Sequence, residues 1–134
     1  MIVLDASAAV ELLLNTPVAP GIASRAFAAG ETLHAPHLID LEVAQVLRCW
    51  VAAGHVGRGR ADEAIEDLAD LPLSRYPHLM LLPRIWSLRA NATACDAAYL
   101  ALAEGLGATL LTRDAAMARV PGHRAQVEVV GPPD

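Results

Sequence analysis

The chain has 134 residues and a formal net charge of −5, and it is 54% hydrophobic, 19% charged and 4% aromatic. This length suits one domain over residues 1–134 with an aliphatic core, and so apolar a composition excludes a disordered chain. No apolar stretch is long enough to span a bilayer and the N-terminus has no basic start, so we expect a cytoplasmic protein without membrane association. Cys49 and Cys95 lack a CxxC spacing, which argues against a zinc site or a disulfide framework; we expect two buried thiols.

Apolar runs and turn residues predict alternating strands and helices along the chain. In the first half we expect a strand at 2–4, helices at 6–14 and 21–29, a strand at 32–35, and a long helix at 36–53 that has Pro36 in its first turn. In the second half we expect a helix at about 60–71, an extended piece at 73–76, helices at 79–89 and 94–106, a strand at 108–111, a helical turn at 115–119 and a strand at 126–130. This alternation predicts an α/β/α sandwich with a short, mostly parallel central sheet.

Two acidic residues follow predicted strands directly. Asp5 ends the first strand, and Asp114 comes just after the strand at 108–111. In open parallel sheets, binding sites form at the carboxyl ends of strands, so both side chains are candidates for one site.

Two further acids lie on predicted helices, beside the apolar stripe of each. At roughly 100° per residue, Glu42 falls about 60° from the centre of its stripe, and Asp96 lies about as far from the centre of its own. The stripe of the first helix comprises Ile39, Val43, Val46, Leu47 and Trp50. The stripe of the second comprises Cys95, Tyr99, Leu102, Ala103 and Leu106. Both acids therefore border the core and could lean toward Asp5 and Asp114.

Carboxylates that share a pocket repel one another, and a cation makes such a cluster tolerable. Mg²⁺ or Mn²⁺ binds carboxylate oxygens, keeps several waters and can activate one of them for attack on a phosphodiester. Each acid also has a simpler explanation. Asp5 and Asp114 could cap the helices that follow, Asp96 could form a capping box with Thr93, and Glu42 could be a solvated helix residue.

The segments that carry these acids resemble the motifs of the PIN-domain ribonucleases, and within them the VapC-like toxins of bacterial type II toxin–antitoxin pairs. The four similar segments are 3–8, 35–48, 88–103 and 110–114, and the resemblance runs from residue 1 to about residue 130. It implies that the metal site and the catalytic residues are Asp5, Glu42, Asp96 and Asp114, with Ser7 and Thr112 in support. Cys95 stands where relatives often have an aromatic residue. Met117 stands where some have a further acid, so we expect a second metal to bind weakly or not at all.

The resemblance also implies what the protein does. Its members cleave RNA internally with Mg²⁺ or Mn²⁺, commonly transfer or ribosomal RNA, and thereby inhibit translation and growth. A cognate VapB-like antitoxin blocks the site, and the toxin forms a homodimer. The alternative is a PIN module that no longer cuts and instead binds RNA or a protein partner.

The chain has ten arginines and no lysine. Arg48, Arg89 and Arg113 lie near the motif acids and are candidates for contact with RNA phosphates, although pairing with those acids is the equal alternative. The net charge disfavours a nucleic-acid partner, but bound divalent ions reverse the local sign. Receiver and haloacid-dehalogenase-like enzymes also place Asp at strand ends, but they need a lysine that this chain lacks.

Two pairs of residues are weaker candidates. His34 and His37 lie three apart, but one falls in a strand and the other at a helix start, so we expect packing or surface roles rather than metal binding. Trp50 and Trp86 occupy helical positions, where tryptophan fills cores or dimer faces more often than it stacks on bases.

Overall fold

A computed structural model of the chain describes residues 1–132, and the core of the fold is a five-stranded sheet. The strands are β1 (Ile2–Leu4), β2 (Leu33–Pro36), β3 (Leu73–Tyr76), β4 (Thr109–Thr112) and β5 (Gln126–Val129), in the spatial order β3-β2-β1-β4-β5. All four neighbouring pairs are parallel, so the sheet is parallel throughout. The predicted sandwich is confirmed.

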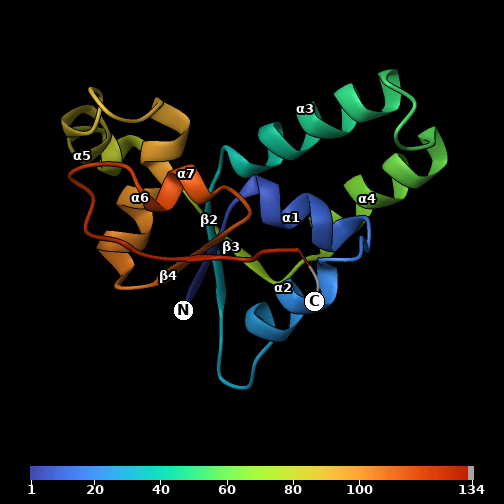
Figure 1. Cartoon of the computed structure of the whole chain (residues 1–134), viewed down its shortest axis with the longest axis horizontal. Helices are drawn as coiled ribbons and strands as arrows, with labels where there is room; N and C mark the ends of the chain where they lie inside the picture. The colour runs from blue at the N-terminus through green and yellow to red at the C-terminus, as the bar shows by residue number, and fades with distance from the viewer. Residues whose placement is uncertain (133–134) are drawn as a thin grey trace.

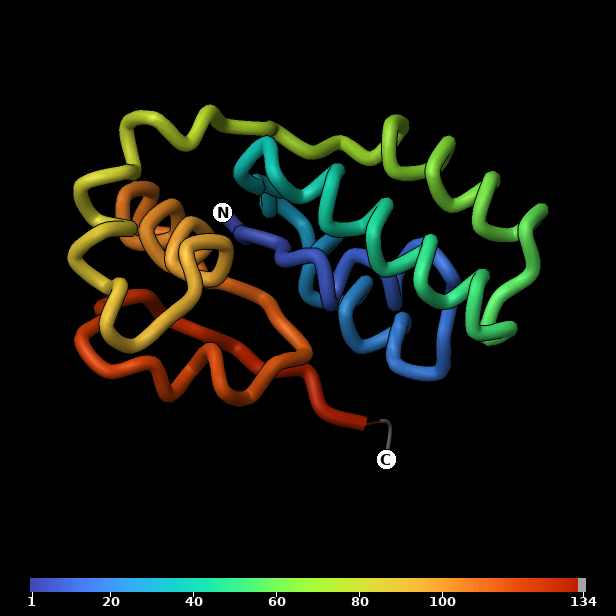
Figure 2. The backbone as a smooth tube through the Cα atoms, turned by 90° about the horizontal axis from the view of Figure 1, so that it is seen from above, coloured from blue at the N-terminus to red at the C-terminus, as the bar shows by residue number. Residues whose placement is uncertain are grey.

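Helices cover both faces of this sheet. Figure 1 shows α5 and α6 on one side of the strands and α1, α3 and α4 on the other. The helices are α1 (Ala6–Leu13), α2 (Ala19–Ala26), α3 (Ile39–Ala52), α4 (Arg58–Asp70), α5 (Leu82–Ser87), α6 (Ala94–Leu106) and α7 (Ala115–Ala118), with a 3-10 turn η1 at Leu79–Leu81. In Figure 2, α3 and α4 lie alongside each other and the α5–α6 region lies at the opposite end of the molecule. Because all strands are parallel, each helical connection brings the chain back to the same end of the strands.

The middle of α6 is the most deeply buried helical segment. Residues 97–103 are all buried, and the helix packs on β1, β2 and β4. Thr93 caps its start by accepting a hydrogen bond from the Asp96 amide at 3.1 Å, and Gly107 ends it with a φ of 64°, a left-handed conformation that glycine adopts without a Cβ penalty. The first turn of α6 is therefore fixed in place at the end of the sheet.

Three predictions about local structure are wrong. Pro36 is the last residue of β2, and α3 begins only at Ile39, because the chain stays extended until the His37 amide has bonded to the Tyr76 carbonyl at 2.8 Å. Helix α2 begins at Ala19, with Pro20 in its first turn, rather than at Gly21. Both cysteines are exposed, since Cys49 lies on the outer face of α3 and Cys95 in the first turn of α6, ahead of its buried middle.

Within residues 1–132, no helix has the length and apolar character needed to cross a membrane.

Candidate active site

The strand order itself creates a place for a site. From β1 the chain proceeds to β2 and β3 on one side, while β4 and β5 lie on the other, so the order reverses between β1 and β4. Ligands of open α/β sheets bind in the crevice at the carboxyl ends of strands at such a point. Leu4 pairs with Leu111 at these ends; Asp5 directly follows β1, and Asp114 comes two residues after the end of β4.

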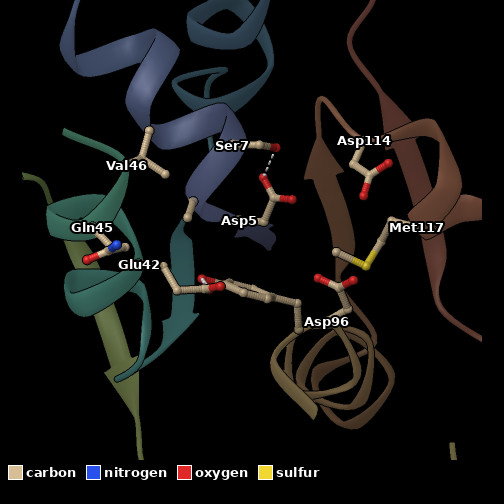
Figure 3. Close-up of a pocket in the computed structure, with 10 residues that line it drawn as sticks. Asp5, Ser7, Glu42, Gln45, Val46, Asp96, Asp114 and Met117 are labelled. Atoms are coloured by element: carbon tan, nitrogen blue, oxygen red, sulfur yellow. Dashed lines mark hydrogen bonds between the residues drawn. The ribbon is translucent and has the colours of Figure 1, made fainter. Parts of the chain in front are cut away.

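All four predicted acids line one pocket at this crevice. Asp5 comes from the end of β1, Glu42 from the first turn of α3, Asp96 from the first turn of α6, and Asp114 from the loop after β4. Figure 3 shows Glu42 on α3 and Asp96 on α6 at opposite sides of the pocket, with Asp5 at the end of β1 and Asp114 in the loop after β4. The remaining lining residues are Ala6, Ser7, Gln45, Val46, Tyr99 and Met117.

Asp5 is held by a network of donors. Its Oδ1 accepts from the Ser7 hydroxyl at 2.7 Å and from the Ala8 amide at 3.0 Å, and its Oδ2 accepts a short hydrogen bond from the Thr112 hydroxyl. The backbone amides of Arg113 and Asp114 donate in turn to Ser7 Oγ and Thr112 Oγ1, each at 3.0 Å. Asp5 therefore caps α1 and also faces the pocket, so capping and membership of the site coexist in one side chain.

Glu42 is half-buried and accepts a hydrogen bond from Tyr99, a residue that the sequence predicts only as part of the apolar stripe of its helix. The Tyr99 hydroxyl donates to Glu42 Oε1 at 2.7 Å. Burial, with the negative charge of Glu42 beside it, raises the pKa of Tyr99 above its ordinary value, so the phenol remains a donor. The helical stripe located Tyr99, but no pattern in the sequence shows where its hydroxyl points.

Asp96 and Asp114 each combine a helix-start position with a place in the pocket. Asp114 Oδ1 accepts from the Ala116 amide at 2.9 Å, which makes it the cap of α7. At α6 only half of the expected capping box is present in the described residues: the Asp96 amide donates to Thr93 Oγ1, but no Thr93 amide bond to the Asp96 carboxylate occurs. The Asp96 carboxylate thus remains available to the pocket, as Figure 3 shows.

The carboxylates are close enough to affect one another's ionisation. Burial is the main cause that raises the pKa of Asp5, and the charge of Asp96 adds to it. Burial also raises the pKa of Glu42, with further contributions from Asp96 and Asp5, and the pKa of Asp96, with a contribution from Asp114. The repulsion expected of a shared acidic site is present.

The pocket contains no basic side chain among the described residues that line it. Its four carboxylates are hard oxygen donors, the type that Mg²⁺ and Mn²⁺ prefer, and their mutual repulsion is what a divalent cation relieves, so the donor set fits such an ion in kind. Across residues 1–132, however, no three His, Cys, Asp or Glu side chains are arranged as a ready-made metal cage. To bind an ion, the acids would have to draw closer together.

None of the three candidate arginines lines this pocket. Arg48 lies in a groove between α3 and α4, and Arg89 stacks on Trp86, 4.8 Å from the ring centre. The Arg113 side chain points to the residue that follows β5, where Nη1 donates to the Val130 carbonyl at 2.6 Å. Contact of these arginines with RNA stays a prediction.

The secondary candidates have structural roles or lie outside the pocket. His34 is buried, and its two ring nitrogens bond to Thr32 and Tyr76, so it packs within the sheet as expected. Trp50 packs against the core, whereas Trp86 is 66% exposed. Met117 lines the pocket where a further acid would stand, so weak binding of a second metal stays a prediction.

Comparison with known proteins identifies the family. A family model described as PIN domain matches residues 2–123, so the chain belongs to the PIN-domain family. Ribonuclease VapC12 of Mycobacterium tuberculosis is 42% identical over 97% of this chain and 99% of its own length. VapC ribonuclease Mb0985 of Mycobacterium bovis is 40% identical over 97% of this chain and 98% of its own length. Within the PIN domains, the chain thus groups with the VapC ribonucleases.

Solved structures agree on the fold. PAE2754 from Pyrobaculum aerophilum superposes with a TM-score of 0.69 at 24% identity, covering 96% of this chain and 83% of that one. VapBC2 from Rickettsia felis, solved with a DNA fragment from its promoter, superposes with a TM-score of 0.69 at 15% identity, covering 96% and 98%. These similarities confirm the α/β/α architecture.

Proposed function

We propose that this chain is a metal-dependent endoribonuclease, the toxin of a toxin–antitoxin pair. The observation that carries the proposal is the pocket at the switch point of the sheet, where Asp5, Glu42, Asp96 and Asp114 converge without a basic neighbour. The curated relatives that match nearly the whole chain are named ribonucleases, which supports RNA as the substrate.

The residues would divide the work as follows. When bound, Mg²⁺ or Mn²⁺ activates water and offsets charge on the phosphodiester. The four acids would hold the ion, and Asp5 is the most firmly held of them because Ser7, Thr112 and the Ala8 amide already fix its two oxygens. We expect structured RNA, such as transfer or ribosomal RNA, to be cut and translation to stop.

Two partners belong to the proposal. A VapB-like antitoxin would block the pocket, in line with the solved complex named VapBC2. For a homodimer, we propose an interface on η1 and α5, where four apolar side chains within one short segment are exposed and which we call the α5 patch: Leu79, Met80, Leu82 and Trp86. Exposed apolar clusters of this kind mark interfaces.

Cleavage and metal assays test the enzyme. Purified protein should cut a structured RNA with Mg²⁺ or Mn²⁺, and EDTA should stop it. Total cellular RNA would map the target. Folded protein that binds RNA under the same conditions but leaves it intact would instead favour a non-cleaving PIN module.

A separate experiment tests the antitoxin. Purification of the chain from its native host should bring down a small companion protein that inhibits cleavage when added back. Recovery of the chain alone, with full activity, would contradict this part of the proposal.

A further inference from the structure

Tyr99 is a buried residue whose hydroxyl reaches the acidic pocket. The side chain is only 2% exposed, yet it belongs to the pocket lining. Its hydroxyl donates to Glu42 Oε1 at 2.7 Å and so joins α6 to α3 across 57 residues of sequence. Tyr99 lies one helical turn after Asp96, and a single turn of α6 therefore carries one acid of the site and the hydrogen-bond partner of another.

The bond leaves the two oxygens of Glu42 in different situations. Oε1 is occupied by the phenol, whereas Oε2 accepts no hydrogen bond from any residue between 1 and 132. A glutamate side chain rotates about several bonds, and one strong donor on a single oxygen selects an orientation and presents the other oxygen. Donors that hold metal-binding side chains in this way are a general part of metal sites.

Glu42 depends on this one donor more than Asp5 depends on any of its own. Asp5 has three donors to its carboxylate, while in the described part of the chain the Tyr99 hydroxyl is the only donor to the Glu42 carboxylate. Loss of one donor should therefore disturb Glu42 more than Asp5.

Building on the proposed metal-dependent function, we propose that Tyr99 is a positioning residue for Glu42: its hydroxyl holds Oε1 and leaves Oε2 as the oxygen that would be free to bind a cation. The role belongs to the hydroxyl and not to the ring. A tyrosine that merely filled the core would be replaced by phenylalanine without consequence for metal binding.

The test measures the affinity of the whole protein for Mn²⁺ alone, by titration with electron paramagnetic resonance detection of free Mn²⁺. Tyr99→Phe should raise the Kd for Mn²⁺ by about 10- to 100-fold, the usual effect of losing a donor to a metal ligand. The matched control is Tyr76→Phe, because Tyr76 is the second of the two tyrosines and its hydroxyl bonds to His34 at 2.6 Å, away from the pocket. The control should bind Mn²⁺ like the parent.

A double-mutant cycle separates positioning from packing. Mn²⁺ binding is followed by the rise in melting temperature at millimolar Mn²⁺. In a Glu42→Gln background, Tyr99→Phe should reduce this rise little further. An equal loss in both backgrounds, or a Kd for Tyr99→Phe equal to that of the parent, would overturn the inference. If Glu42→Gln removes all binding, the comparison with Tyr76→Phe decides alone. A parent protein that binds no Mn²⁺ would instead refute the proposed function.

Discussion

Replacing Asp5 by asparagine should separate stability from activity. The amide oxygen of the introduced asparagine can still accept from the Ala8 amide, as Asp5 Oδ1 does at 3.0 Å, because asparagine caps helices as well as aspartate. The new NH₂ group would face the Thr112 hydroxyl, which can rotate to accept it. The substitution also removes a buried charge whose pKa is raised by burial. We therefore expect the free energy of unfolding without metal to change by no more than about 1 kcal/mol.

Alanine at the same position is the matched comparison. Asp5→Ala loses the cap of α1, which costs about 1 kcal/mol, and leaves the Ser7 and Thr112 hydroxyls without their acceptor. These hydroxyls lie 3.3 Å apart and can bond to each other, which limits the added cost to about 1–2 kcal/mol. Asp5→Ala should therefore be less stable than the parent by about 2–3 kcal/mol in urea unfolding with EDTA.

Both variants should lose RNA cleavage by at least about 100-fold with Mg²⁺, since asparagine removes the charge and one oxygen from the proposed metal site and alanine removes the charge and both oxygens. Cleavage of a structured RNA under single-turnover conditions measures this loss. An Asp5→Asn protein that is folded and cuts RNA as fast as the parent would refute the assignment of Asp5. An Asp5→Asn protein that is as unstable as Asp5→Ala would refute the account of the hydrogen-bond network.

Three further predictions concern pH, metal binding and assembly. Burial raises the pKa of the Asp5 carboxyl in the folded state, so the metal-free parent should gain stability relative to Asp5→Asn as pH falls from neutral toward the ordinary carboxyl range, and lose it as pH rises again. Urea unfolding at several pH values measures this. A difference in the free energy of unfolding between the two proteins that stays constant with pH would contradict it. Met117→Asp, which adds an acid to the pocket lining, should tighten Mn²⁺ binding by about tenfold while lowering the melting temperature of the metal-free protein, because Met117 is 3% exposed; an unchanged Kd would refute the idea that this position limits metal binding. Met80→Glu in the α5 patch, where Met80 is 86% exposed, should shift the protein to monomer in analytical ultracentrifugation without a loss of stability, and an unchanged dimer would place the interface elsewhere.

The sequence predicted the elements well where local signals were strong. The apolar run before Asp5 predicts a strand at 2–4, and local signals predict a helix at 94–106; both are confirmed with these bounds. Pro36 misled because proline suits both a first helical turn and the end of a strand, and only the pairing with β3 decides between them. The extent of a strand depends on its neighbours in the sheet, which local patterns do not contain.

In the candidate site, too, the sequence located residues better than it predicted the directions of their side chains. Strand-end positions and helical periodicity made the four acids candidates for one site, and the resemblance to PIN domains implied that they share it. All four line one pocket. The orientation of longer side chains was beyond that reasoning: the Arg113 side chain turns to Val130, and the Tyr99 hydroxyl turns to Glu42. Cys95 was expected in the buried stripe of α6, but its turn lies ahead of the segment that the sheet covers. Such details depend on tertiary packing.

A pocket lined by four carboxylates and no cationic side chain has a consequence for the living cell. Without metal, the negative charge of the carboxylates would repel an approaching phosphodiester. If RNA is cut as proposed, the metal-free protein would be inactive and would become active only when the pocket binds Mg²⁺. Under the proposed function, the concentration of free Mg²⁺ around the protein would therefore set the rate of RNA cleavage.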